Sequence, residues 1–459
     1  MKIQNPATLA VLDDVPSDDA ARIAQKYARA RAAQPAWAKT PLAQRLAALT
    51  AFKDAVAREH EQLALTLTRE VGKPLAQSRN ELNALAGRIE FFLTNTARVL
   101  EPEVVLEERD GTLTKLEEDI GFEPLGVVAN VSAWNYPWFV GSNVFVPALL
   151  TGNTVLYKPS EHATLTGLAI ERLLHESGVP KDAFISVVGG GEVGAALIDQ
   201  PVNGVFFTGS YRTGKKIAER VASRFVRLGL ELGGKDPTYV CEDVDARKAA
   251  ESLADGAMYN TGQSCCSVER IYVHRALADE FVKQFVDVVK SFVSGDPEDA
   301  GTYIGPLARE EQLSELELQV RDAVEKGAKL LIGGKRAGRT GHYFEPTVLS
   351  GARNDMRLMR EESFGPIIGI GIVDSDAEAV ERMNDTDYGL TAGVYCKDRE
   401  RARAILSQVD AGSVYWNCCD RVSPRLPWTG RKHSGLGSTL STHGIRSFLQ
   451  PKAWHLRAP

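Results

Sequence analysis

The sequence predicts an α/β protein with two doubly wound lobes and a small β ribbon. From Gly126 onward, short apolar runs such as GVVANVSAW and NGVFFTGS end in Gly, Ser or Trp, and helical stretches such as TGKKIAERVASRF separate them. Strands that alternate with helices are typical of a parallel sheet covered by helices. A second series, with PTYVCED, RIYVHR and IIGIGIVD, begins near Gly233. Two series indicate two lobes, with a hinge near ELGGK (231–235).

Two segments precede the first of these strands. Residues 17–98 are rich in Ala, Leu, Glu and Arg, and their apolar positions recur at helical spacing, so we expect several amphipathic helices there. The stretch LTKLEEDIGFEPLG (113–126) alternates apolar and charged residues. Alternation with this much charge predicts a ribbon of strands outside the main core.

Composition excludes several classes of protein. The 459 residues carry 54 Lys and Arg against 60 Asp and Glu, a net charge of −6 spread along the chain, which gives no electrostatic footprint for nucleic acid. The sequence contains no run of eighteen apolar residues, so no membrane span is expected. The N-terminus lacks the pattern of a signal peptide. Six cysteines, four of them in adjacent pairs, do not suggest a disulfide framework, so we expect a reducing cytoplasm.

Two glycine-containing turns are candidate phosphate sites. VVGGGEVG contains a G-x-G-x-x-G pattern at Gly189, Gly191 and Gly194, but no acidic residue follows at the usual distance, so an ordinary strand-to-helix turn explains it as well. FFTGSYRTG is the stronger candidate, because Gly209 and Ser210 lie between an apolar run and a helix start. Backbone N–H groups at a helix N-terminus attract phosphate. The alternative is a plain N-cap.

LYKPSE places Lys158 and Glu161 just after another apolar run. Nucleotides bind at the carboxyl ends of strands in α/β sheets. A lysine and a carboxylate there can hold the ribose hydroxyls, and the carboxylate would repel a 2′-phosphate, which favours NAD over NADP. A solvated pair of loop charges is the alternative.

NTGQSCCSVER (260–270) contains adjacent cysteines, Cys265 and Cys266. A thiolate is a strong nucleophile, but a free thiol at neutral pH is mostly protonated and needs a helper. None of the eight histidines lies in a recognisable hydrolase motif, so a cysteine hydrolase is a weak hypothesis.

Two other residues can assist a cysteine. Glu231 ends the apolar run RLGLE, where partial burial would make it a general base for water; a salt bridge to Lys235 is the alternative. Asn135, in SAWNYPW, can donate its amide to a developing oxyanion, or it can be a turn residue.

Taken together, these segments resemble the NAD(P)-dependent aldehyde dehydrogenase superfamily over nearly the whole chain. PLGVVANVSAWNYP is similar to the oxyanion segment of that family, LYKPSE to its adenosine-ribose segment, FTGSYRTG to its pyrophosphate turn and LELGGK to its general-base motif. NTGQSCCSVER resembles the catalytic cysteine motif, and EESFGP, NDTDYGL and GSVYWN resemble later family motifs. The resemblance implies two Rossmann-like lobes with a β ribbon for oligomerisation.

The resemblance also implies a role for each motif. The family pattern Gly-Gln-x-Cys selects Cys265 as the nucleophile that attacks the aldehyde, with Cys266 lining the pocket. Asn135 and the Cys265 N–H would hold the oxyanion, and Glu231 would activate the water that hydrolyses the thioester to the acid. No metal is expected. The residues expected to bind NAD, with NADP the less favoured cofactor, are Ser132, Trp134, Lys158, Glu161, Gly209, Ser210, Gly233, Glu362 and Phe364.

The substrate pocket is expected to be mostly apolar, which favours medium-chain aliphatic or aromatic aldehydes. Succinate-semialdehyde relatives carry an arginine where Asn143 stands, and its absence argues against a short carboxylated substrate. Arg421 and Arg425 could still supply positive charge at the mouth, so a semialdehyde remains an alternative; solvated loop positions are the simpler explanation. The residues expected to line the pocket are Tyr136, Trp138, Phe139, Val140, Asn143, Ser264, Cys266, Val422 and Trp428.

The resemblance divides the chain into three parts. Residues 1–105 and 125–233 would form the NAD-binding domain, and residues 234–433 the catalytic domain. Residues 106–124 and 434–459 would form the oligomerisation segment of a homodimer or homotetramer. PWTGRKHSGLG, near the substrate loop, departs from the usual family pattern, which weakens the substrate assignment.

The same fold is compatible with two further functions. An acylating relative would pass the acyl group to coenzyme A, but such relatives tend to lack the carboxylate at the position of Glu231. A non-catalytic, structural use of the fold would be expected to lose Cys265 or Glu231, and both are present.

Overall fold

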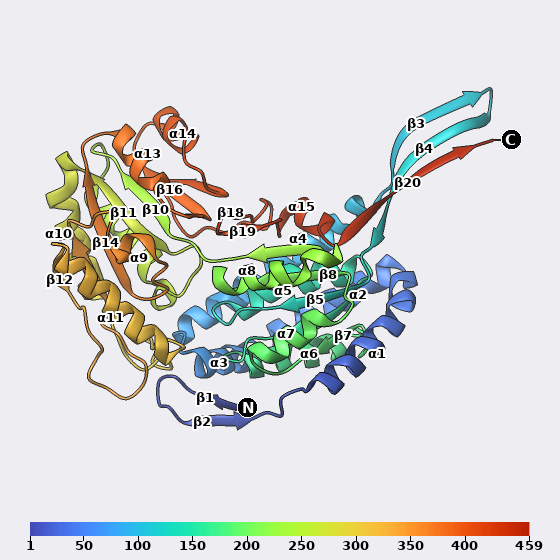
Figure 1. Cartoon of the computed structure of the whole chain (residues 1–459), viewed down its shortest axis with the longest axis horizontal. Coiled ribbons are helices and arrows are strands. Elements are labelled where there is room, and N and C mark those ends of the chain that lie inside the picture. The colour runs from blue at the N-terminus through green and yellow to red at the C-terminus, as the bar shows by residue number, and fades with distance from the viewer. Residues whose placement is uncertain (459) are drawn as a thin grey trace.

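The computed structural model, which describes residues 1–458, has two α/β lobes and a projecting β arm (Figure 1). The two lobes confirm the predicted fold class. A short hairpin of β1 (Lys2–Gln4) and β2 (Val11–Asp14) begins the chain. It contacts the second lobe, where the His342 N–H donates to the Pro6 carbonyl at 2.9 Å.

The first lobe is built on a six-stranded sheet with the order β19-β9-β8-β5-β6-β7. All neighbours are parallel except the short edge pair β19–β9. The strands are β5 (Val127–Val131), β6 (Thr154–Lys158), β7 (Phe184–Ser186), β8 (Gly204–Thr208), β9 (Arg227–Glu231) and β19 (Gly435–Leu436).

Helices cover both faces of this sheet. Alternate residues of β5 enter two different cores, Val128 on one face and Val127 with Ala129 on the other, as the period of a strand requires. One face carries α2 (Leu42–Arg58), α3 (His60–Val71), α4 (Leu75–Leu100), α5 (Pro137–Leu150) and α6 (Thr164–Glu176). The other carries α1 (Ala20–Lys39), α7 (Gly191–Asp199) and α8 (Tyr211–Val221), which is followed by η1 (Ala222–Arg224).

The second lobe is built on a seven-stranded sheet with the order β12-β13-β14-β11-β10-β16-β17, antiparallel only between β12 and β13. Its strands are β10 (Asp236–Val240), β11 (Val268–His274), β12 (Lys329–Ile332), β13 (Thr347–Ser350), β14 (Ile367–Val373), β16 (Thr391–Tyr395) and β17 (Ser413–Trp416). Its helices are α9 (Ala246–Met258) with η2 (Tyr259–Gly262), α10 (Arg275–Ser291), α11 (Glu310–Glu325), α12 (Arg357–Arg360), α13 (Asp376–Asn384) and α14 (Arg399–Leu406). A small pair, β15 (Tyr388–Gly389) and β18 (Arg431–Lys432), lies beside it.

The arm is a three-stranded antiparallel sheet that extends away from both lobes (Figure 1). Its strands are β3 (Glu103–Asp110), β4 (Leu113–Pro124) and β20 (Leu449–Arg457). The sequence segment 434–459 therefore divides. Only β20 joins the arm, while β19 pairs with β9 and α15 (Ser441–Arg446) packs Ile445 into the first lobe.

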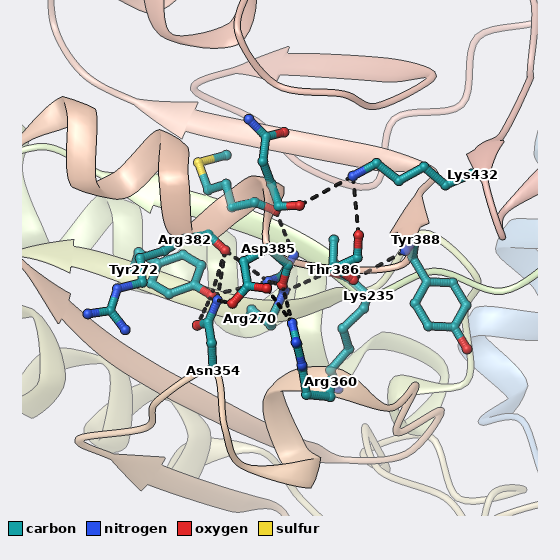
Figure 2. Close-up of polar contacts among 12 residues, drawn as sticks. Lys235, Arg270, Tyr272, Asn354, Arg360, Arg382, Asp385, Thr386, Tyr388 and Lys432 are labelled. Carbon is teal, nitrogen blue, oxygen red and sulfur yellow. Dashed lines mark hydrogen bonds and ion pairs between the residues drawn. The ribbon is translucent and has the colours of Figure 1, made fainter.

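Two adjacent residues of β11 tie the second sheet to its surrounding loops. Arg270 is fully buried, and its guanidinium donates to the Lys235 carbonyl at 2.9 Å and to carbonyls at the end of α13, including that of Met383 at 2.9 Å (Figure 2). Glu269 accepts from the buried Lys235 ammonium at 2.5 Å and from the backbone N–H groups of Ser363 and Phe364, both at 3.0 Å. Glu269 and Arg270 thus connect β11 to three separate segments: the segment at Lys235, the end of α13 and the loop at residues 363–364.

Glu269→Gln should destabilise the protein strongly, because it leaves the Lys235 ammonium buried without a counter-charge. Breaking one partner of a buried ion pair costs about 3–5 kcal/mol. The measurement is the midpoint of urea unfolding followed by fluorescence. Glu251→Gln is the matched control, because Glu251 pairs with Arg247 in an exposed bridge and its loss should cost under about 1 kcal/mol. Equal effects of the two substitutions would contradict a structural role for Glu269.

Candidate active site

Two cavities meet between the lobes at Cys265 and Glu231. One, of about 470 Å³, lies over the carboxyl ends of the first-lobe strands. The other, of about 760 Å³, lies against α4, α5 and the loop 420–428. Cys265 and Glu231 are the two residues that line both cavities. A ligand from each side can therefore reach the same pair of side chains.

The cysteine turn has an unusual backbone. Asn260, Thr261 and Gly262 follow α9 with φ of +53°, +58° and +70°. A Cβ on Gly262 would lie 2.2 Å from the Gly365 carbonyl, so only glycine fits there, and the turn is held directly against the EESFGP loop. Within residues 1–458 the Cys265 backbone N–H has no hydrogen-bond acceptor. That donor is free for a ligand oxygen.

Asn135 lies beside the cysteine turn. Its side-chain amide donates to the Gln263 carbonyl at 3.2 Å, and the Asn135 carbonyl accepts from the Asn260 amide at 3.3 Å. Asn135 and Cys265 both line the smaller cavity. The structure therefore brings together the three residues to which the sequence assigned the chemistry, Asn135, Glu231 and Cys265.

The two cysteines occupy different environments. Cys265 is half-buried and faces both cavities, whereas Cys266 is buried and its thiol donates to the Asp420 carboxylate at 2.9 Å. A hydrogen bond with Cys265, burial and the charge of Asp420 together hold the pKa of Cys266 well above its usual range. Cys266 is thus kept as a neutral thiol in the cavity wall.

Glu231 ends β9 at the junction of the cavities. Burial raises its pKa to about 7, against the opposing effects of a hydrogen bond from Thr439 and the positive charge of Arg88. The alternative suggested by the sequence, a salt bridge to Lys235, is wrong, because the Lys235 ammonium pairs with Glu269. A carboxylate that titrates near neutrality can both accept and release a proton.

The smaller cavity contains every residue that the sequence assigned to the cofactor. Ser210 caps α8, and its hydroxyl accepts from the Thr213 N–H at 3.3 Å. Lys158 and Glu161 pair at 3.5 Å. The full set that lines the cavity is Ser132, Trp134, Lys158, Glu161, Gly209, Ser210, Gly233, Glu362 and Phe364.

The donors of this cavity fit a dinucleotide. The Ser132 hydroxyl is buried with no protein partner, so a polar atom is available to a ligand. Glu362 is half-buried, and a Cβ on Gly233 would lie 2.4 Å from its carboxylate oxygens, so glycine keeps the space that the carboxylate occupies. Burial raises the pKa of Glu362 to about 8. A helix N-terminus, hydroxyl groups and a carboxylate suit phosphate and ribose.

Several residues of this cavity were missed or set aside. Gly191 and Gly194, of the pattern treated as a doubtful phosphate site, line it at the start of α7, and Gly194 lies against the Lys158 side chain. Lys216, Arg220 and Arg309 add positive charge to its wall. Lys216 and Arg220 lie one turn apart on α8, a helical spacing that is visible in the sequence.

The larger cavity contains most of the residues expected for the substrate. These are Tyr136, Phe139, Val140, Asn143, Ser264, Cys266, Val422 and Trp428, together with the rim residues Arg421 and Arg425. The expectation for Trp138 is wrong, because Trp138 is fully buried in the core of the first lobe. Phe139 and Asn143 are four residues apart on α5 and share a face, whereas Trp138 faces the core.

Most of the surface of this cavity is apolar, as expected, but charged side chains also contribute to its wall. Glu81, Arg88, Asp255 and Asp420 line it as well. Arg88 comes from α4 and donates to the Asn143 amide oxygen at 2.8 Å. The lack of an arginine at position 143 had argued against a carboxylated substrate, but Arg88 places a guanidinium beside that position. Burial lowers the pKa of Arg88 to about 10, so it stays protonated at neutral pH.

Comparison with known proteins agrees with this geometry. The chain belongs to the aldehyde dehydrogenase family, whose model matches residues 1–454. It is therefore an enzyme of the class that oxidises aldehydes with NAD or NADP. No helix among the described residues has the length and hydropathy to cross a membrane.

The relatives act on varied aldehydes. The chain is 37% identical to 3,6-anhydro-alpha-L-galactose dehydrogenase of Streptomyces coelicolor, over 100% of this chain and 93% of that one. It is 33% identical to succinate-semialdehyde dehydrogenase [NADP(+)] of Deinococcus radiodurans, over 98% and 93%. The crystal structure of lactaldehyde dehydrogenase from Escherichia coli superposes with a TM-score of 0.95 at 32% identity, over 100% and 96%.

Proposed function

We propose that this chain oxidises an aldehyde to its carboxylic acid through a thiohemiacetal and then a thioester on Cys265. The observation that carries the proposal is the junction of two cavities at Cys265 and Glu231. One cavity has the donors that a dinucleotide needs, and the other is lined by side chains that could contact a small aldehyde. The nucleophile and the half-buried Glu231 carboxylate lie where ligands of the two cavities would meet.

The first step is addition of the Cys265 sulfur to the aldehyde carbon. The carbonyl oxygen becomes an oxyanion, and the Asn135 amide and the unpaired Cys265 N–H are the donors for it. The neighbouring Cys266 cannot compete, because its sulfur is buried and bonded to Asp420. The thiohemiacetal carbon on Cys265 would then release a hydride, which the nicotinamide ring would accept when the cofactor is bound, and the acyl group would remain on Cys265 as a thioester.

Residues of the smaller cavity would position the dinucleotide. The Ser210 turn at the start of α8 would hold the pyrophosphate, and Glu362 the nicotinamide ribose. Phe364 packs edge-to-face on Trp134 at 5.5 Å, which fixes an aromatic wall beside Cys265. Lys158 and Glu161 would hold the adenosine ribose. The Glu161 carboxylate would repel a 2′-phosphate, so NAD is proposed as the preferred cofactor.

Hydrolysis of the thioester is assigned to water activated by Glu231. The Glu231 carboxylate takes a proton from water as the water oxygen attacks the acyl carbon, and the Cys265 thiolate leaves. Transfer of the acyl group to coenzyme A is disfavoured, because a carboxylate of raised pKa already occupies the position from which water is activated. For the substrate, the three arginines that line the larger cavity, Arg88, Arg421 and Arg425, support a semialdehyde over an aliphatic or aromatic aldehyde.

Separate cysteine variants test the reaction. Cys265→Ala should lower kcat for NADH formation by at least about a thousandfold, because removal of a nucleophile abolishes the covalent route. Cys266→Ala should keep kcat within about tenfold, because Cys266 only lines the wall. The assay is absorbance of NADH with a panel of aldehydes, and NADH binding by fluorescence shows that both variants fold. Loss of activity in Cys266→Ala alone would reverse the assignment.

Thr439→Val tests the base. The Thr439 hydroxyl stabilises the ionised form of Glu231, so its removal should raise the Glu231 pKa from about 7. Because the base acts when deprotonated, the deacylation rate rises with pH through this pKa, and the midpoint should move upward by about one unit. Single-turnover release of acid across pH gives the midpoint. Thr439→Ser keeps the hydroxyl and should leave the midpoint in place; an unchanged midpoint in Thr439→Val would remove Glu231 as the base.

We also propose that the arm joins two chains. Its strands expose apolar side chains, among them Val104 (65%) and Leu113 (72%), and the outer edges of β3 and β20 lack partners within the described chain. Unpaired edges with exposed apolar residues mark association surfaces.

Sedimentation tests the association. The protein should sediment as at least twice its 50.0 kDa chain mass at micromolar concentration. The double substitution Val104→Lys and Trp454→Lys should release monomers, because it places charge on the arm. Phe225→Lys, which changes an exposed aromatic side chain on the first lobe, is the control. A monomeric wild type would contradict the proposal.

A further inference from the structure

Arg88 is a buried arginine in the wall of the larger cavity. It lies on α4, 6% of its surface is exposed, and it lines the cavity together with Cys265. The guanidinium donates to the Asn143 amide oxygen at 2.8 Å and stacks over the Phe139 ring, 4.1 Å from the ring centroid. These two contacts, both from α5, fix the plane and the position of the group.

This charge has no ion-pair partner among the described residues. Within residues 1–458 no carboxylate lies within 4.0 Å of the Arg88 guanidinium, and Asn143 is its one hydrogen-bond partner. A guanidinium has five N–H donors, so most of them are without a protein acceptor. A buried charge without a partner is costly. The structure therefore holds a desolvated cation in a site where a ligand can reach it.

The carboxylates of the same cavity are already engaged. Glu81 pairs with the Lys73 ammonium at 2.5 Å and accepts from the Trp138 N–H at 3.0 Å. Asp420 accepts from the Cys266 thiol, Asp255 accepts from the Tyr303 hydroxyl and Glu231 accepts from the Thr439 hydroxyl. Glu231 and Glu81 act on the Arg88 charge only from beyond ion-pair distance, and no carboxylate of this set hydrogen-bonds to Arg88.

The rim of the cavity adds charge of the same sign. Arg421 and Arg425 line it, and neither forms an ion pair within the part of the chain that the structure describes. A neutral aliphatic aldehyde would offer nothing to these three arginines. A carboxylate matches the planar fork of a guanidinium and can accept two hydrogen bonds from it.

We propose that Arg88 binds a carboxylate at the far end of the aldehyde, so that the enzyme is selective for semialdehydes. This inference rests on the proposed function, because it places the reacting end of the same molecule at Cys265. Asn143 and Phe139 act as positioning residues, since they orient the guanidinium toward the cavity. Arg421 and Arg425 attract the anion to the mouth.

The test compares two substrates of equal chain length, succinic semialdehyde and butanal. The measured quantity is kcat/KM for each, in the wild type and in Arg88→Gln, whose amide can still donate to Asn143. Arg88→Gln should lower the value for succinic semialdehyde by about a hundredfold, since it removes a buried hydrogen-bonded charge pair. The value for butanal should fall less than about fivefold. Because any effect of Arg88 on Glu231 reaches both substrates, the ratio isolates recognition of the carboxylate.

Two further variants complete the comparison. Arg88→Lys keeps the charge and should recover part of the preference for succinic semialdehyde, mainly through KM. Arg98→Gln changes an exposed arginine on the same helix and should leave both substrates unaffected. Equal losses for the two substrates in Arg88→Gln would overturn the assignment, as would a wild-type preference for butanal. A loss confined to Arg425→Gln would place the recognition at the rim and would also overturn it.

A binding measurement separates this inference from the proposed reaction. Calorimetric titration of succinate into the wild-type protein should show binding that Arg88→Gln lacks and that butanol does not reproduce. If neither aldehyde is oxidised but succinate binding depends on Arg88, the reaction fails and the recognition stands. If oxidation proceeds and succinate binds both proteins equally, the recognition fails and the reaction stands. Thermal melting of each variant shows that it is folded.

Discussion

The buried pair of Lys235 and Glu269 is the interaction on which the active site depends. Lys235 belongs to the LGGK segment that follows Glu231, and Glu269 belongs to the strand that follows Cys265, so their contact at 2.5 Å joins the two motifs. The same Glu269 carboxylate accepts the N–H groups of Ser363 and Phe364 and so fixes the loop that carries Glu362. Arg270 adds the end of α13 to this arrangement (Figure 2). One fully desolvated pair thus holds three functional segments in register.

The same contacts determine which side chains of the site face the two cavities. The cysteine turn packs against the EESFGP loop, the half-buried Cys265 sulfur faces both cavities, and the adjacent Cys266 sulfur lies in the wall against Asp420. Glu231 lies half-buried at the same junction, and its removal from solvent raises its pKa to about 7. On the proposed mechanism, burial raises the pKa of Glu231 and so makes it a base near neutral pH. The hydrogen bond from the Thr439 hydroxyl lowers the same pKa. The arm and the outer helices play no direct part in this chemistry.

The sequence predicted the parts of the site that lie at the ends of strands. Lys158, Ser210 and Glu231 could be placed together because parallel strands bring their carboxyl ends to one edge of a sheet, and the family resemblance assigned their roles. Arg88 could not be foreseen, because helical periodicity marks a face as buried without saying what an arginine on that face will meet across another helix. Trp138 was misplaced because adjacency to Asn135 says little once α5 turns each residue by about 100° from the last. The doubtful glycine pattern at 189–194 reached the cavity for a similar reason, since its place depends on the packing of α7 beside Lys158.

The most direct test of the central claim is the mass of the acyl-enzyme. Glu231→Gln should form the thioester but hydrolyse it slowly, so incubation with succinic semialdehyde and NAD should leave an acyl group on the protein. Digestion and mass spectrometry locate that group, and a sample without NAD is the control. The account predicts an NAD-dependent succinyl mass on Cys265. An acyl group on Cys266, or none despite NADH formation, would contradict it.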